Sequence, residues 1–290
     1  MPQNSAASRS IIVGVDSSDN AARAAAWAAR EAAERGLHLH LVHALDLPPS
    51  MGPLIEGPDY DRTRRATGQA LLDRLADKLH EQHPDVNVDT ELSTLGAAET
   101  LVGLSGDAEL VVTGTRGHGG FAGMLLGSVS LKVAAHARCP AVVVRGELSY
   151  EPLNEIVLGV EPGQAEAPIR FAFATAAELG ATVSVVRAWS PSPAYAGYYV
   201  ADAVEGREAA EAAEVADLIK AVREDHPRVG VSTHVMLGNP VSALISAAVS
   251  SRLLVIGAHR HRGPLSVGVG YVVQGLLSHA STPVVVVPVV

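Results

Sequence analysis

A glycine-rich stretch in the first half of the sequence has the residue types that bind phosphate. Gly114, Gly117 and Gly127 are followed directly by Ser128-Val129-Ser130, where a helix is expected to begin. Glycines let the backbone approach a ligand closely, and the N-terminus of a helix presents N–H groups and the positive end of a dipole. These features suit phosphate oxygens, so the stretch predicts a phosphate-binding loop.

Asp16 is a second candidate for ligand binding, because it ends an apolar run that begins at Ile11. An acidic side chain can accept hydrogen bonds from ribose hydroxyls, and the hydroxyls of Ser128 and Ser130 can donate them. Each of these residues also has a structural explanation. Asp16 could be the N-cap of the Ala-rich segment 20–35, and the two serines could cap the helix that follows the glycine-rich stretch.

The sequence lacks the motifs of several well-known catalytic sites. It contains no G-x-x-x-x-G-K-[ST] loop, no G-x-G-x-x-G after the first strand and no G-x-S-x-G turn. The sequence also shows no paired carboxylates and no Cys/His arrangement typical of a catalytic nucleophile. We therefore expect no catalytic residue, and at most slow hydrolysis of a bound nucleotide.

Several histidines could suggest a metal site, notably His38 and His40 on one face of an expected strand, and His259 and His261 in a basic run. No carboxylate or cysteine stands near them at ligand spacing, so we interpret them as solvated or capping residues and expect no metal site. Cys139 is the only cysteine, which excludes an intramolecular disulfide. A proline and an apolar run follow it, which indicates a buried thiol.

The elements that must position these residues alternate in the order β-α-β-α-β-α-β-α-β. The short apolar runs at 110–114 and 141–145 show no polar alternation, which is typical of strands buried on both faces. This order implies a parallel sheet of about five strands with helices on both faces. Ligands of such sheets bind beyond the carboxyl ends of strands, here after Asp16 and Thr113. The expected strands are residues 11–16, 37–45, 86–93, 110–114 and 141–145, and the expected helices are 20–35, 61–83, 97–105 and one from 128.

The second half of the chain repeats the first. Ile11–Asp16 recurs as Ile156–Glu161, 145 residues later, and Val111–Val144 recurs as Leu254–Val287, 143 residues later. Near-constant spacing over the full length indicates a tandem duplication, and thus two Rossmann-like α/β domains. The two domains are expected to span residues 9–146 and 155–290.

Composition and charge exclude some classes of partner. Hydrophobic residues make up 48% of the chain and charged residues 18%, as in globular proteins. The net charge of −9, with no Lys/Arg-rich run, argues against binding to nucleic acid. Residues 1–10 contain no apolar segment, and no later run approaches the roughly 20 apolar residues of a membrane span, so the sequence predicts a cytoplasmic protein without membrane contact.

The spacing G-x2-G-x9-G-[ST] after V-V-T-G resembles the ATP-binding signature of universal stress proteins. The opening V-G-V-D-S-S, the L-V-H-A-L run and the closing G-S-V-S…C-P-A-V-V-V are also similar to that family, and the resemblance covers the chain twice. It implies ATP as the ligand, with Mg bound through the phosphates. It also implies that Asp16 and the backbone of Val15 and Ala44 bracket adenine and ribose. The residues implied to hold ribose and phosphates are Gly114, Gly117, Gly127, Ser128, Val129 and Ser130.

The second half departs from this signature. Asp16 is replaced by Glu161, Gly117 by Arg260 and Ser128 by Tyr271. An arginine side chain could fill the phosphate space, so we expect residues 156–290 not to bind ATP as the first half does. The alternative is that the arginine clamps phosphate through its guanidinium.

Three functions are consistent with the sequence to different degrees. The resemblance favours a regulatory ATP-binding switch in a stress response, with an unidentified protein partner. The alternative is a nucleotide-independent scaffold that acts through dimerisation and protein contacts. An enzyme related to adenine-nucleotide α-hydrolases would need an S-G-G-x-D-S loop, which Val15–Ser18 is not. The resemblance also implies that the last strands of the two halves pair within the chain, and that the chain forms a homodimer.

Overall fold

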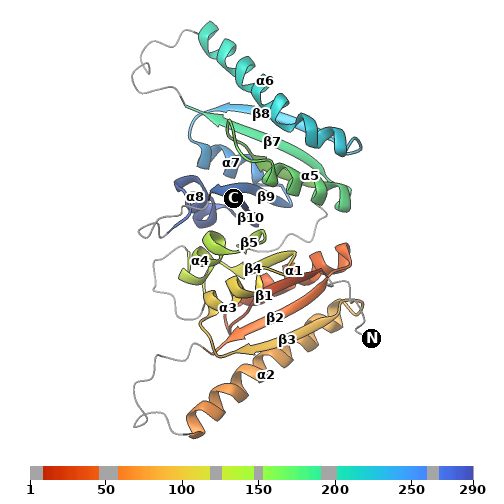
Figure 1. Ribbon diagram of the computed structural model, residues 1–290, viewed down its shortest axis with the longest axis vertical. Coiled ribbons are helices and arrows are strands. Elements are labelled where there is room, and N and C mark those ends of the chain that lie inside the picture. The colour runs from red at the N-terminus through yellow and green to blue at the C-terminus, as the bar shows by residue number, and fades with distance from the viewer. Residues whose placement is uncertain are drawn as a thin grey trace. The chain divides into compact units, whose positions relative to one another are not determined.

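The computed structural model describes residues 9–45, 58–117, 126–146, 153–190, 201–259 and 268–289. The chain divides into two compact units, Met1–Leu148 (the first unit) and Ser149–Val290 (the second unit). Within the described ranges each unit alternates five strands with four helices (Figure 1). The predicted fold class is confirmed, since each unit is an α/β domain with a parallel sheet and helices on both faces.

The first unit follows the predicted order of elements. Its second helix begins at Pro58 rather than at residue 61, because proline fits the first position of a helix, where its missing N–H is not needed. The elements are β1 (Ser10–Gly14), α1 (Asp19–Arg35), β2 (His38–Ala44), α2 (Pro58–Gln82), β3 (Val88–Ser93), α3 (Ala97–Leu104), β4 (Leu110–Gly114), α4 (Ser128–His136) and β5 (Ala141–Val144).

The second unit repeats this arrangement. Its elements are β6 (Glu155–Gly159), α5 (Ala167–Leu179), β7 (Thr182–Trp189), α6 (Ala201–Asp225), β8 (Val231–Leu237), α7 (Pro240–Ala248), β9 (Leu253–His259), α8 (Tyr271–His279) and β10 (Val284–Val289). In the first unit β4 and β5 are apolar and buried, as the lack of polar alternation predicted.

The strand order of the first unit is β3-β2-β1-β4-β5, and every neighbouring pair is parallel. From β1 the chain builds outward through β2 to β3, and then returns to place β4 on the other side of β1. The direction of winding therefore reverses between β1 and β4, so the loops that follow these two strands face each other at the carboxyl edge. Helices α1 and α2 pack on one face of the sheet, and α3 and α4 pack on the other. The second unit has the corresponding order β10-β9-β6-β7-β8.

The junction between β1 and α1 is defined by short-range contacts. Ser18 is the N-cap of α1, and its Oγ accepts a hydrogen bond from the Ala21 N–H at 3.2 Å. Gly36, at φ 63°, ends the helix in the left-handed conformation that favours glycine. A Cβ on Gly114 would lie 2.7 Å from the Asn20 carbonyl group, so glycine lets the end of β4 approach the start of α1.

Cys139 lies in the core of the first unit beside Val111 and Val133. Burial raises the pKa of its thiol to about 12. At pH 8 a rise of this size lowers the thiolate fraction about a thousandfold relative to an unfolded chain. We expect a thiol-specific disulfide reagent to label Cys139 rapidly in guanidinium chloride and at least about 100-fold more slowly in the native protein. Equal rates would contradict the burial of this side chain.

Candidate functional site

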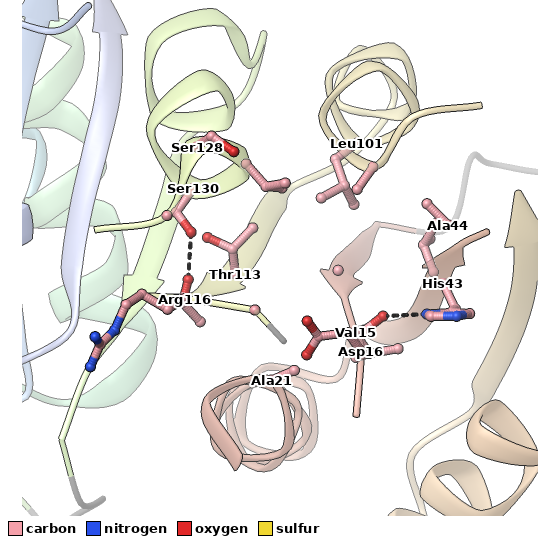
Figure 2. A pocket seen from close by; sticks show the side chains of 17 residues that line it. Val15, Asp16, Ala21, His43, Ala44, Leu101, Thr113, Arg116, Ser128 and Ser130 are labelled. Atoms are coloured by element: carbon pink, nitrogen blue, oxygen red, sulfur yellow. Dashed lines mark hydrogen bonds between the residues drawn. The ribbon is translucent and has the colours of Figure 1, made fainter. Parts of the chain in front are cut away.

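A cavity of about 330 Å³ opens at the carboxyl ends of β1, β2 and β4 in the first unit (Figure 2). It lies where the loops after β1 and β4 meet. All nine residues that the sequence singled out for ligand binding line this one cavity. They are Val15, Asp16, Ala44, Gly114, Gly117, Gly127, Ser128, Val129 and Ser130.

Asp16 is held at the edge of the cavity by the start of α1. Its Oδ1 accepts hydrogen bonds from the Ser18 N–H at 2.9 Å and from the Ser18 hydroxyl at 2.5 Å. Ser18 rather than Asp16 is the N-cap, so the capping explanation of Asp16 is wrong. Gly117 stands directly opposite, since a Cβ at this position would lie 2.3 Å from Asp16 Oδ2. The carboxylate therefore occupies the space that any larger residue at 117 would need.

The two loops that form the cavity are tied together by the backbone carbonyl of Arg116. This oxygen accepts a hydrogen bond from Asn20 Nδ2 at 3.1 Å, and lies 3.3 Å from the Ser18 hydroxyl, whose hydrogen is donated to Asp16 Oδ1. Asn20 belongs to the first turn of α1 and Ser18 is the N-cap of that helix, whereas Arg116 follows β4. The contacts hold Gly117 close to Asp16, so the glycine-rich backbone and the carboxylate form one surface.

The N-terminus of α4 faces the same cavity without a side-chain cap. Gly127 is the N-cap residue, and its N–H donates to the Thr115 carbonyl at 2.7 Å. Ser130 is buried, and its hydroxyl donates to the Gly114 carbonyl at 2.6 Å (Figure 2). Neither Ser128 nor Ser130 caps the helix, so that alternative is wrong. The N–H groups of the first turn of α4 thus face the cavity, and no capping side chain accepts a hydrogen bond from them.

The opposite wall is the open end of β2. The β1–β2 pairing stops at Gly14 and Val42, so the backbone of Ala44 extends beyond β1 on that side. His43 Nδ1 donates a hydrogen bond to the Val15 carbonyl at 2.8 Å, since a carbonyl can only accept (Figure 2). This bond fixes the turn after β1, a role that the sequence analysis did not assign to His43. The L-V-H-A-L run contained the residue, but not its distance to Val15.

Thr113 is a second lining residue that the sequence analysis did not assign. Its side chain is 3% exposed, and its hydroxyl has no hydrogen-bond partner among the residues that the structure describes. A buried hydroxyl without a partner costs about 1–3 kcal/mol, so a polar atom of a ligand in this cavity would relieve that cost. The sequence does mark this residue, because it is the one polar side chain in an otherwise apolar strand.

The charges around the cavity are few. Asp16, His43 and Arg116 are the titratable residues among the described lining residues. The Arg116 guanidinium extends away from the other labelled side chains (Figure 2). It lies near Arg145, whose pKa is lowered by burial and then by the charge of Arg116. Arg260, which the alternative for the second half would use as a phosphate clamp, lies outside the described residues.

The described ranges hold no group of three or more His, Cys, Asp or Glu side chains arranged for a metal ion. His40, which the sequence analysis interpreted as solvated or capping, is instead half-buried and lies 3.3 Å from Glu91. No helix in these ranges has both the length and the apolar character required to cross a membrane.

Comparisons with known proteins agree with the fold and with the repeat. The sequence matches the Universal stress protein family over residues 7–145 and again over residues 153–288. A universal stress protein of Mycobacterium tuberculosis strain H37Rv is 30% identical over 286 residues, which cover 95% of both chains. A relative from Mycolicibacterium smegmatis is 30% identical over 293 residues, or 98% of both chains. The crystal structure of a universal stress protein from Archaeoglobus fulgidus has a TM-score of 0.67 at 15% identity, covering 97% of this chain and 98% of that one.

Proposed function

Because the chain belongs to the universal stress protein family, with two of its domains in tandem, we propose that the first unit binds ATP and acts as a regulatory switch. The observation that carries the proposal is the convergence of three features on one cavity. These are the Asp16 carboxylate, the open backbone of Ala44 and the uncapped N-terminus of α4. An acid for ribose, a strand edge for a base and a helix N-terminus for phosphate are what an adenine nucleotide requires.

The residues present fit such a ligand. A cavity of about 330 Å³ is within the usual range for a small-molecule site. Adenine would lie beside the backbone of Val15 and Ala44, with ribose at Asp16. The phosphates would extend along Gly117 and Gly127 to the first turn of α4. Mg²⁺ would be bound through the phosphate oxygens and water, as this ion usually is in nucleotide sites.

The lining offers little for rapid hydrolysis. A general base must lie within hydrogen-bond reach of the attacking water and be available to accept its proton. Asp16 accepts two hydrogen bonds from Ser18, and His43 donates to the Val15 carbonyl. Both are used to shape the loop after β1. This supports a function in which nucleotide occupancy, rather than turnover, carries the signal to a protein partner.

Calorimetric titration of ATP-Mg into the full chain tests the proposal. We expect saturable heat with one site per chain, and thermal stabilisation that rises with ATP concentration. Hydrolysis measured in the same samples should remain slow compared with ordinary enzymes. No heat and no stabilisation at millimolar ATP would contradict the proposal, and would favour a scaffold that works without nucleotide.

The two serines of α4 should separate structure from binding. Ser128→Ala should weaken ATP binding about three- to tenfold, because the exposed hydroxyl at the start of the helix is lost to the phosphates. Ser130→Ala should leave ATP affinity within about threefold, but lower the free energy of unfolding by about 1–2 kcal/mol, because the Gly114 carbonyl loses its donor. Calorimetry and chemical denaturation of both variants measure these effects, and the reverse pattern would contradict the roles assigned here.

A further inference from the structure

The second unit has its own cavity, of about 260 Å³, at the carboxyl ends of β6, β7 and β9. Its position is equivalent to that of the first cavity, because Gly159 pairs with Val186 in the register in which Gly14 pairs with Val42. Arg187 and Ala188 therefore occupy the places of His43 and Ala44. The two cavities can be compared residue by residue.

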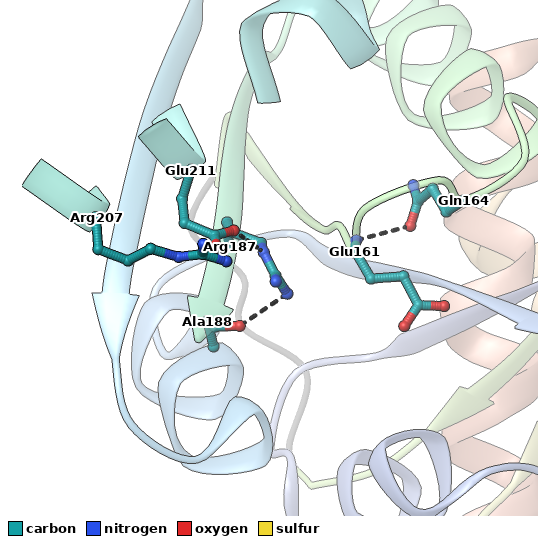
Figure 3. A network of polar contacts seen from close by, with 6 residues as sticks. All are labelled: Glu161, Gln164, Arg187, Ala188, Arg207 and Glu211. Atoms are coloured by element: carbon teal, nitrogen blue, oxygen red, sulfur yellow. Dashed lines mark hydrogen bonds and ion pairs between the residues drawn. The ribbon is translucent and has the colours of Figure 1, made fainter. Parts of the chain in front are cut away.

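The strand edge that is open in the first unit is occupied in the second. Arg187 Nη1 donates a hydrogen bond to the Ala188 carbonyl at 2.9 Å (Figure 3). In the first unit, His43 donates to the Val15 carbonyl instead. The Ala188 carbonyl is the counterpart of the Ala44 carbonyl, which lies beside the proposed adenine site. A base that needs this acceptor would have to compete with an internal hydrogen bond.

A buried ion pair holds Arg187 in this position. Its Nε lies 2.8 Å from Glu211 Oε2, and Glu211 is 1% exposed. In the first unit the corresponding position on α2 is Gly68, where a Cβ would lie 2.9 Å from the His43 ring. The histidine and glycine of one unit are thus replaced together by the arginine and glutamate of the other. The ion pair with Glu211 therefore fixes the position of Arg187 at this strand end of the second unit.

The part of the second cavity that corresponds to the proposed phosphate site of the first also differs. The floor residue Thr113 is replaced by Ile256, which removes the buried hydroxyl. Tyr271 opens α8 in the place of Ser128 and is 70% exposed. Its hydroxyl accepts a long hydrogen bond from Asn239 Nδ2 at 3.5 Å, which links the starts of α7 and α8. The second cavity keeps its apolar walls but loses the small hydroxyl residues of the first.

Among the residues that the structure describes, the charge next to this cavity is negative. An adjoining cavity of about 400 Å³ shares Val160, Glu161 and Arg187 with it, and is also lined by Glu214 and Asp217 of α6. Arg187 is the one cation among the described residues of its wall, and it is already paired with Glu211. Glu161, Glu214 and Asp217 are exposed. Within a Debye length of about 8–10 Å these carboxylates repel phosphate and attract cations.

The first unit keeps one of these three charges, since Glu161 corresponds to Asp16, but it lacks the two on α6. Leu71 and Arg74 of α2 stand where Glu214 and Asp217 stand on α6, and Gly68 stands where Glu211 does. The acidic side chains of α6 are therefore specific to the second unit. They adjoin an apolar slot walled by side chains such as Val186, Leu244 and Ile256.

We propose that the second unit binds an aromatic organic cation, with its ring system in the apolar slot and its amine facing Glu161, Glu214 and Asp217. The apolar walls fit a planar ring, and the carboxylates fit the positive charge. The occupied Ala188 carbonyl and the negative wall disfavour an adenine nucleotide at the same place. The two units would thus respond to ligands of opposite charge.

Quinacrine, a fluorescent acridine with a cationic alkylamine chain, is a suitable probe. Fluorescence anisotropy with the full chain at low salt should show one saturable site that ATP-Mg does not displace. 9-Anthracenecarboxylate, a planar anion with three fused rings, should bind at least about tenfold more weakly. Ile256→Trp should abolish quinacrine binding by filling the slot. Gly117→Glu, placed in the first unit, should leave it unchanged.

Charge variants make the test independent of core packing. The triple variant E161Q/E214Q/D217N changes only exposed side chains and should weaken quinacrine binding at least about tenfold at low salt. The matched control D77N/E81Q/D85N removes the same charge from exposed positions of the first unit and should stay within about twofold. Absence of quinacrine binding, equal losses in both triple variants, equal affinity for the anion or displacement by ATP would each overturn the proposal. A second ATP site lost in Ile256→Trp would also overturn it, and would leave ATP binding by the first unit standing.

Discussion

Gly117→Glu is expected to abolish ATP binding by the first unit, with a loss of at least about 100-fold in affinity. The new Cβ would lie 2.3 Å from Asp16 Oδ2, so the carboxylate must leave its place beside Ser18. The added negative charge would also face the phosphates. Two like charges about 4 Å apart near a protein surface repel by about 4 kcal/mol, and each 1.4 kcal/mol is a tenfold change in affinity. Calorimetry with ATP-Mg measures the loss.

Gly103→Glu is the matched control for this variant. Gly103 is an exposed residue of α3, and a Cβ there would meet no atom within 4 Å. The control introduces the same residue and charge into the same unit, so it should bind ATP as the unaltered chain does. If Gly117→Glu kept its affinity, or if both variants lost it equally, the phosphate site would not lie where Asp16 and Gly117 meet.

Glu211→Ala is expected to lower the free energy of unfolding of the second unit by about 3–5 kcal/mol. Removing one partner of a buried ion pair leaves the other charge uncompensated. Glu211 is 1% exposed and bonds both Arg187 and Arg207, so its loss would leave the half-buried Arg187 guanidinium against the sheet (Figure 3). Trp189 follows Ala188 and is buried in the second unit. Its fluorescence in a Trp27→Phe background reports the unfolding of that unit.

A double variant separates the loss of the pair from the loss of packing. R187H/E211G copies the His43 and Gly68 combination of the first unit, and should recover at least half of the lost stability. Full recovery is not expected, because glycine within a helix costs about 1 kcal/mol relative to alanine. If Glu211→Ala changed stability by less than about 1 kcal/mol, the pair would contribute no more than an ordinary surface contact.

The pH dependence of the same unit follows from the Glu211 carboxyl. Burial alone would raise its pKa, but hydrogen bonds and charges from Arg187 and Arg207 outweigh burial and lower the pKa. A carboxyl with a lowered pKa in the folded state stabilises the fold above its unfolded pKa of about 4.3, and loses this effect as pH falls through the folded value. The second unit should therefore lose stability in acid, and Glu211→Ala should reduce that acid dependence.

The fold could be predicted because its signals are local. The apolar runs at β4 and β5 contain no polar alternation, which is typical of buried strands. Once the order of strands and helices is known, few topologies are compatible with right-handed crossovers. Parallel strands also place their carboxyl ends at one edge. Asp16 and the glycine-rich stretch could therefore be assigned to one site before any distance was known.

The roles of individual side chains could not be predicted in the same way. The Ser130 hydroxyl bonds the Gly114 carbonyl, although a free hydroxyl facing a ligand was equally consistent with the sequence. His43 fixes Val15 across 28 residues, and Arg187 pairs with Glu211 across 24. Neither partner can be identified from spacing, since each belongs to a different element or loop.

The amino-acid sequence was sufficient for the duplication, the α/β order and the carboxyl edge at which the cavities open, because hydrophobic period and turn residues act within a few positions of the chain. The difference at the strand ends of the two cavities required the folded structure. A strand-end carbonyl is open or occupied according to which side chain reaches it. In the first unit α2 places Gly68 beside the strand end, whereas in the second unit α6 places Glu211 there, where it pairs with Arg187. Hydrogen bonds and ion pairs of this length form only once the helices have packed on the sheet.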